Sequence, residues 1–286
     1  LLADAGGFAE IYPEDKYTVV RHLQAAGHVA GMTGDGVNDA PALRQAEVGI
    51  AVSSATDVAK GAASVVLTEP GLVNIVALVE QGRAIYQRIL TWVINKVSRT
   101  IFKSVFVSVA FILSGKFVVS AFAMLLLTFM TDFAKIALAT DHVRPSPKPE
   151  TWNIGGYVAV SAALGLAMVA EGLLALWYGW SRFGLATNDG ALTTFSFLTM
   201  IYFAVFSIVS ARERRGFWAS MPGKALLAAL AADALIGTAL TRIGLPSLGP
   251  LPASQTLALF AFAALSCLGV NDLLKVVLLK RLAAAG

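Results

Sequence analysis

The pattern of apolar and polar residues changes near residue 70 of this 286-residue chain. Before that point, short apolar runs alternate with amphipathic stretches, which indicates α/β structure. The pattern predicts strands at 28–32, 48–52 and 65–67, and helices at 14–26, 38–45 and 55–62. Because helices follow each short apolar run, we expect a parallel sheet. Three strands are too few for a whole domain of this class, so residues 1–70 are predicted to be the C-terminal part of a larger α/β domain.

After residue 70 the chain becomes strongly apolar. One long helix is predicted from 72 to 113, amphipathic to Leu90 and apolar beyond it. Further apolar stretches follow at 118–140, 154–180, 191–210, 225–241 and 252–274, each near the ~20 residues that a membrane-spanning helix needs. The pattern therefore predicts an amphipathic helical segment at 71–91 and an α-helical polytopic membrane domain with six transmembrane helices at 92–286.

Composition and charge agree with a membrane protein. Hydrophobic residues make up 57% of the chain and the mean hydropathy is +0.70, values outside the soluble range. Residues 1–90 carry six Lys/Arg against ten Asp/Glu, whereas 91–286 carry sixteen against eight. Most basic residues fall in loops on the side of residues 1–70, so the positive-inside rule predicts a multi-pass protein with this head and the C-terminus in the cytoplasm.

Other interaction classes find no support in the sequence. Outside the membrane segments no basic run is interleaved with aromatic residues, so nucleic-acid binding is not expected. The single cysteine, Cys267, lies in an apolar stretch and forms no intrachain disulfide. Because the chain begins with Leu1 rather than Met, we expect it to be truncated.

The most distinctive stretch covers residues 33–44 and follows directly on the first predicted strand. It reads Thr33-Gly34-Asp35-Gly36-Val37-Asn38-Asp39-Ala40-Pro41-Ala42-Leu43-Arg44. Gly34 and Gly36 allow a sharp bend, and Asp35 and Asp39 are placed to face one point at the start of the next helix. Such a point suits Mg²⁺, which binds through one or two carboxylates together with phosphate oxygens. The alternatives are a simple capped turn or a dinucleotide loop, which would need a third glycine.

Taken whole, this stretch resembles the hinge motif of P-type ATPases, ion pumps whose phosphorylation domain has a haloacid-dehalogenase-like fold. Upstream, Pro13-Glu14-Asp15-Lys16 resembles the family segment whose lysine contacts the phosphoryl group, although Lys16 alone would pass for a solvated charge. The resemblance implies catalytic roles for Lys16, Asp35, Asn38 and Asp39, with Mg²⁺ held by Asp35 and Asp39. The chain departs from the family's Ala-Asp-Gly-Phe-Ala where it reads Ala5-Gly6-Gly7-Phe8-Ala9.

Ionisable residues also lie inside the predicted spans. They are Lys103, Asp132, Lys135, Glu171 and Asp233. Each costs about 2–3 kcal/mol at a membrane centre unless it is paired or hydrated, so a functional role is the default hypothesis. Pairing near an interface is the simpler explanation for Lys135 and Asp141. Asp132 sits halfway along its span with Thr128 and Thr131 nearby, which predicts a polar patch on one helical face.

Three stretches resemble the plasma-membrane proton-pumping branch of the family: residues 33–37, 66–72 and 141–152. In that branch an Asn-Asp pair in the sixth membrane helix carries the proton-accepting carboxylate, and here the pair reads Thr131-Asp132. The resemblance implies that Asp132 is the proton ligand, with Thr131 beside it and Lys103 as its best candidate partner. Mg²⁺ or another cation is the alternative cargo. Glu171 and Asp233 are weaker candidates because they lack matching motif context.

Several parts of such a pump do not occur in the sequence: the Asp-Lys-Thr-Gly-Thr phosphorylation site, the Thr-Gly-Glu actuator loop, a nucleotide domain and four earlier membrane helices. The resemblance thus implies the C-terminal portion of an ATP-driven cation pump, inactive alone, whose N-terminal part lies in the same or a separate chain. A split-pump subunit and a non-catalytic membrane remnant that binds or regulates a partner are the alternatives.

Overall fold

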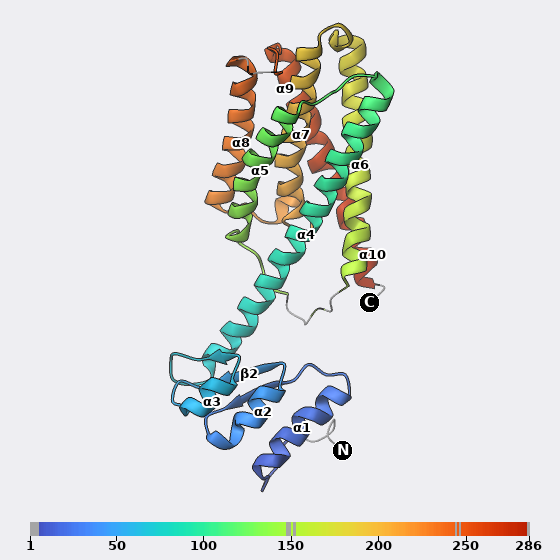
Figure 1. The fold of residues 1–286 in the computed structure, drawn as a ribbon. Coiled ribbons are helices and arrows are strands. Elements are labelled where there is room, and N and C mark those ends of the chain that lie inside the picture. Colours follow the sequence, from blue (N-terminus) through green and yellow to red (C-terminus); the bar gives the residue numbers. More distant parts are fainter. Residues whose placement is uncertain (1–5, 147–149, 151–152, 244, 246, 285–286) are drawn as a thin grey trace. The chain divides into compact units, whose positions relative to one another are not determined.

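The computed structural model describes residues 6–146, 150, 153–243, 245 and 247–284. Parts of the predicted family motifs, namely Ala5 and residues 147–149 and 151–152, lie outside the described residues, as does the chain start. The chain forms two compact units, Leu1–Gly82 and Arg83–Gly286, which are called here the head unit and the membrane unit. Figure 1 labels their helices and strands.

The head unit contains a small parallel sheet. Its strands are β1 (Gly31–Gly34), β2 (Val48–Ala51) and β3 (Val65–Val66), in the order β1-β2-β3. Thr33 pairs with Ile50, and Ile50 pairs with Val65 on the other side. The parallel pairing predicted from the sequence is therefore confirmed, while three strands are too few to make a haloacid-dehalogenase-like domain evident.

Three helices accompany this sheet: α1 (Pro13–Ala25), α2 (Ala40–Gln45) and α3 (Asp57–Ala62). Local sequence explains where they begin. Pro13 occupies the first turn of α1, where a missing N–H costs nothing, and the Thr56 hydroxyl caps α3 by accepting a hydrogen bond from the Ala59 N–H. Small side chains such as Ala42 and Ala59 are fully buried, so the helices pack closely on the sheet.

The first strand begins later than the sequence predicts. β1 starts at Gly31 rather than at His28, because the His28 N–H still donates to the Leu23 carbonyl at the end of α1 (3.0 Å). Gly27 turns the chain there with a φ of +85°, which a residue with a side chain rarely adopts. Val29 is consequently 81% exposed instead of forming the core.

Gly49 of β2 marks the closest approach between α2 and the sheet. A Cβ atom at this residue would lie 2.2 Å from the Leu43 carbonyl oxygen. We expect Gly49→Ala to destabilise the head by about 1–3 kcal/mol through overpacking, measured as faster hydrogen exchange of the β2 amides. Gly61→Ala in α3 is the matched control, since no atom lies within 4 Å of its Cβ position. Equal exchange rates in the two variants would contradict this packing.

The membrane unit is helical. Within the described residues, six helical segments are long and apolar enough to cross a membrane, which indicates a polytopic membrane protein. They are α4 (Val73–Ser114), α5 (Ala121–Ala139), α6 (Ile154–Arg182), α7 (Asp189–Ala211), α8 (Lys224–Ile243) and the continuous segment Ala253–Ala284. α7 lies among the other helices in Figure 1, and nearly all its side chains are buried, so it forms the core of this unit.

The last helical segment is longer than predicted and is not uniform. It consists of α9 (Ala253–Leu265), the π-helical segment η4 (Ser266–Asn271) and α10 (Asp272–Ala284). The apolar stretch predicted at 252–274 lies within this segment, and the helix continues beyond it. Lys275 does not mark an exposed helix end, because it is fully buried and its ammonium donates to the Ser210 carbonyl on α7 at 2.7 Å.

Candidate functional site

The loop that follows β1 is organised around the carboxylate of Asp39. This side chain folds back, and its Oδ2 atom accepts hydrogen bonds from the backbone N–H groups of Asp35 and Gly36, each at 3.1 Å. Residues Val37–Asp39 form a 3-10 turn that makes this possible. A Cβ atom at Gly34 would lie 2.6 Å from the Asp39 side chain, so glycine is required there for close approach.

Lys16 of α1 completes this arrangement. Its Nζ atom donates to Oδ1 of Asp39 at 2.7 Å, across 23 residues of sequence. The Asp39 side chain is 6% exposed, whereas that of Lys16 is 36% exposed. One carboxylate therefore fixes both the loop and the lysine, and the Lys16 side chain stays partly exposed.

Electrostatics keep Asp39 ionised. Burial opposes ionisation of its carboxyl, but the hydrogen bonds from Lys16, Gly36 and Asp35 outweigh burial and hold the pKa of Asp39 below its usual value. The carboxylate thus carries a full negative charge at neutral pH, and it balances the charge of Lys16.

The other two predicted residues of this site, Asp35 and Asn38, are exposed. The expectation that Asp35 and Asp39 face one point needs refinement, because both oxygens of Asp39 already accept hydrogen bonds from nitrogen. Among the described residues, no group of three or more His, Cys, Asp or Glu side chains is placed to hold a metal. The exposed carboxylate of Asp35 nevertheless suits a hard cation that takes its remaining ligands from phosphate oxygens and water.

In the membrane unit, the predicted polar patch on α5 does not form as expected. The Thr131 side chain is buried and its hydroxyl donates to the Leu127 carbonyl of its own helix at 2.9 Å. Asp132 is exposed on the surface of the unit and pairs with Lys135 on the same helix. The expected partner, Lys103 of α4, forms no ion pair with Asp132, because Lys135 lies one helical turn away and reaches the carboxylate first.

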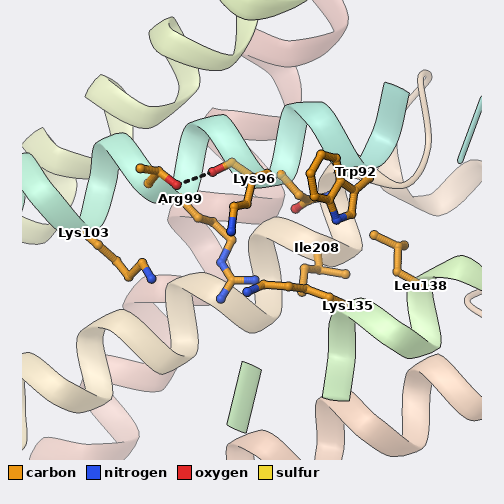
Figure 2. A pocket seen from close by; sticks show the side chains of 9 residues that line it. Trp92, Lys96, Arg99, Lys103, Lys135, Leu138 and Ile208 are labelled. Atoms are coloured by element: carbon orange, nitrogen blue, oxygen red, sulfur yellow. Dashed lines mark hydrogen bonds between the residues drawn. The ribbon is translucent and has the colours of Figure 1, made fainter. Parts of the chain in front are cut away.

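Lys103 instead lines a basic pocket between α4, α5 and α7. Its charged members are Lys96, Arg99 and Lys103 of α4 and Lys135 of α5. Figure 2 shows the charged ends of Lys96, Arg99 and Lys135 gathered on the same side of α4. Asp132 contacts this pocket through its pair with Lys135. The carboxylate predicted to carry the ion therefore borders a strongly cationic environment.

Arg99 and Lys96 are charged members of this pocket that sequence reasoning missed, and Arg99 is the more buried of the two. Arg99 is only 5% exposed, and its Nη1 atom has no hydrogen-bond partner among the described residues. The sequence does contain a pattern that indicates this cluster. Lys96, Arg99 and Lys103 are spaced three and four residues apart, so they share one face of α4.

A buried ion pair closes one end of the membrane unit. Arg212, just after α7, donates to Oδ2 of Asp141 at 2.6 Å, and both side chains are 1% exposed. The same guanidinium donates to the carbonyls of Ser220 and Met221, and the Gly223 N–H donates to the other oxygen of Asp141. The pairing predicted for Asp141 is confirmed, and its role is to join the end of α5 to the start of α8.

The two weaker candidates lie on other helices of the membrane unit, α6 and α8. Glu171 of α6 accepts a hydrogen bond from the Asn271 amide at 2.7 Å, and Asp233 is buried in α8 with 5% of its surface exposed.

The chain is similar to part of a longer known protein. No family model matches the chain. The chain is 36% identical over 283 residues to a protein of Methanocaldococcus jannaschii named "Putative cation-transporting ATPase". The match covers 99% of this chain and 35% of that protein, so the chain spans about a third of the length of this relative.

Proposed function

We propose that this chain is the C-terminal portion of an ATP-driven P-type cation pump, a translocase that couples aspartyl-phosphate turnover in the head to ion movement through the membrane unit. The observation that carries the proposal is the Lys16–Asp39 pair, held against the backbone of the loop after β1. Ligands of parallel α/β sheets bind beyond the carboxyl ends of the strands, which is where this pair lies. The match to a cation-transporting ATPase supports it.

In the proposed reaction, the ammonium group of Lys16 contacts an equatorial oxygen of the transferred phosphoryl group. Asp39 keeps the ammonium in place and holds the loop, so that Asp35 and Asn38 face the same phosphoryl group. The acceptor aspartate and the nucleotide domain that binds the ATP substrate lie in parts of the pump outside this chain.

Mg²⁺ is the cofactor that this chemistry calls for. When bound, it neutralises charge on the phosphate oxygens. Asp35 is its proposed direct ligand, because the side chain is exposed beside the phosphoryl position. Asp39 would coordinate the metal only by giving up the hydrogen bond from Lys16, and otherwise it supports the site through that lysine.

The proposed cargo is a proton, exported across the plasma membrane with the head and the C-terminus in the cytoplasm. Asp132 is the proposed proton carrier, with Thr131 packed beside it. Its pair with Lys135 and the nearby Lys103 place positive charge where a metal cation would have to bind, which favours the proton over Mg²⁺ or another cation.

Lys16→Ala tests the proposal in the complete pump, reconstituted into lipid vesicles. We expect ATP-driven acidification and ATP hydrolysis to fall by about 100-fold or more, as when one charged stabiliser of a transition state is removed. Arg21→Ala is the control, because Arg21 is an exposed cation on the same helix that does not contact Asp39. Acidification is followed with a pH-sensitive dye inside the vesicles.

Full activity of Lys16→Ala would contradict the role of Lys16. Purification of the native protein separates the alternatives: a partner chain that carries the acceptor aspartate would indicate a split pump, and an unrelated partner without ATPase activity would indicate a binding or regulatory protein.

A further inference from the structure

Glu171 is a half-buried acidic side chain within α6, one of the helices long and apolar enough to cross a membrane. It lies roughly 25 Å along α6 from Ile154 and roughly 16 Å from Arg182, at 1.5 Å per residue. The hydrocarbon core of a bilayer is about 30 Å thick, so α6 is long enough to cross it with both ends beyond the core and Glu171 inside it. Among the described residues, Glu171 forms no ion pair, and the amide of Asn271 is its hydrogen-bond donor. An ionised carboxylate in this position would lack a compensating charge.

The partner of Glu171 has an unsatisfied atom. Asn271 is 5% exposed, its Nδ2 atom donates to Oε2 of Glu171 at 2.7 Å, and its Oδ1 atom is buried without a hydrogen-bond partner among the described residues. A buried acceptor left unpaired costs about 1–3 kcal/mol. A carboxyl group that carries a proton removes this cost, because its O–H can donate to Oδ1 while its other oxygen accepts from Nδ2.

Asn271 owes its position to the π-helical segment η4, which ends at this residue. Segments of this kind are rare and often occur at functional sites. The segment also places Cys267 in the core, where its thiol donates to the Phe203 carbonyl of α7 at 3.8 Å. The irregular turn therefore orients polar groups toward α6 and α7 in an otherwise apolar region.

No charged group around Glu171 forms an ion pair with it among the described residues. α4 packs on α6 beside Gly172 and carries Arg99 and Lys103, but neither forms an ion pair with Glu171. Asp272 and Lys275 of α10 form a fully buried pair, and both contact Ser210 of α7. The second oxygen of Asp272 accepts the Phe217 N–H. α9 contributes no ionisable residue, and α7 contributes Asp189 at its far end and Tyr202, whose hydroxyl is hydrogen-bonded to Thr238. None of these groups supplies the positive charge that an ionised Glu171 would need.

We propose that Glu171 and Asn271 form a proton-binding carboxyl–amide pair inside the membrane unit, on helices other than the one that carries Asp132. The proton resides on Glu171 and donates to Oδ1 of Asn271, so both groups are neutral and fully hydrogen-bonded. In the proposed pump this pair adds a second protonatable carboxyl. The pair itself does not depend on pump activity.

Infrared spectroscopy of the full chain in lipid vesicles at neutral pH tests whether Glu171 carries a proton. The wild-type spectrum should contain a carbonyl stretch of a protonated carboxylic acid that Glu171→Gln removes and that shifts downward in D₂O. Glutamine is expected to keep the fold, because its amide accepts from Nδ2 and donates to Oδ1 in the same geometry. Asp189→Asn is the control and should leave the band unchanged, since Asp189 is exposed and paired with Lys116. Identical wild-type and Glu171→Gln spectra would overturn the proposal.

The amide partner needs its own variants. In Asn271→Leu and in the smaller Asn271→Ala, the Glu171 band should move to higher frequency, because its carbonyl loses the hydrogen bond from Nδ2. An unchanged frequency in a variant that retains the helix content of the wild type would overturn the pairing. The readout needs neither ATP nor transport, so failure of the pump proposal and failure of this one are distinguishable.

Discussion

Asp35→Asn in the complete pump is expected to abolish the phosphoenzyme formed from radiolabelled ATP. The backbone of Asp35 is fixed on both sides, since its N–H donates to Asp39 and its carbonyl accepts from the Thr56 N–H at 2.9 Å. Asparagine can keep these bonds and the shape of the side chain. Only the negative charge is lost, and with it the proposed carboxylate ligand of Mg²⁺. We expect the phosphoenzyme level to fall by about 100-fold or more.

Two comparisons make this experiment specific. Asp57→Asn removes an exposed carboxylate from α3 of the same unit and should leave the phosphoenzyme level unchanged. Raising the Mg²⁺ concentration should partly restore phosphorylation in Asp35→Asn if the carboxylate binds the metal. Normal phosphoenzyme at steady state in Asp35→Asn would remove the metal assignment.

The head site shows what a sequence can and cannot predict. The motifs identify Lys16 and Asp39 as candidate site residues. They do not predict the contact between the two side chains, because that contact depends on how α1 packs beside a loop that lies 23 residues further along the chain. The sequence suggests two aspartates at one point. The structure instead turns Asp39 inward, because backbone N–H groups of a tight turn need an acceptor and this carboxylate is the nearest one.

In the membrane unit, the long apolar runs were enough to locate the helices, since a span must satisfy its backbone internally. They did not predict how each helix is rotated. Asp132 was expected to face Lys103, yet it pairs with Lys135, and Arg99 was overlooked although it is the more buried residue. Nor could an apolar stretch reveal η4, because a π-helical turn has no simple sequence signal.

The second large effect is expected from Asp132→Asn, which should leave phosphorylation intact and stop transport. Asparagine matches aspartate in shape but cannot take up or release a proton, so a carrier at this position is lost. The head is a separate compact unit with its own core, so the Lys16–Asp39 pair should be unaffected. The two properties are measured on one preparation, as labelled phosphoenzyme and as ATP-driven acidification of vesicles.

Asp189→Asn is the matched control for this variant, because it removes a carboxylate that is exposed at the start of α7. Its acidification rate should equal that of the wild type. Undiminished acidification in Asp132→Asn would exclude Asp132 from the ion pathway. Loss of the phosphoenzyme together with transport would assign it a structural role, in which its charge is needed to offset the cations of the basic pocket.

Lys135→Ala separates these two roles further, because it frees the Asp132 carboxylate and removes one cation from the pocket. If the role of Asp132 is structural, phosphorylation of Lys135→Ala should be normal. If Asp132 carries the proton, the pH dependence of transport should change.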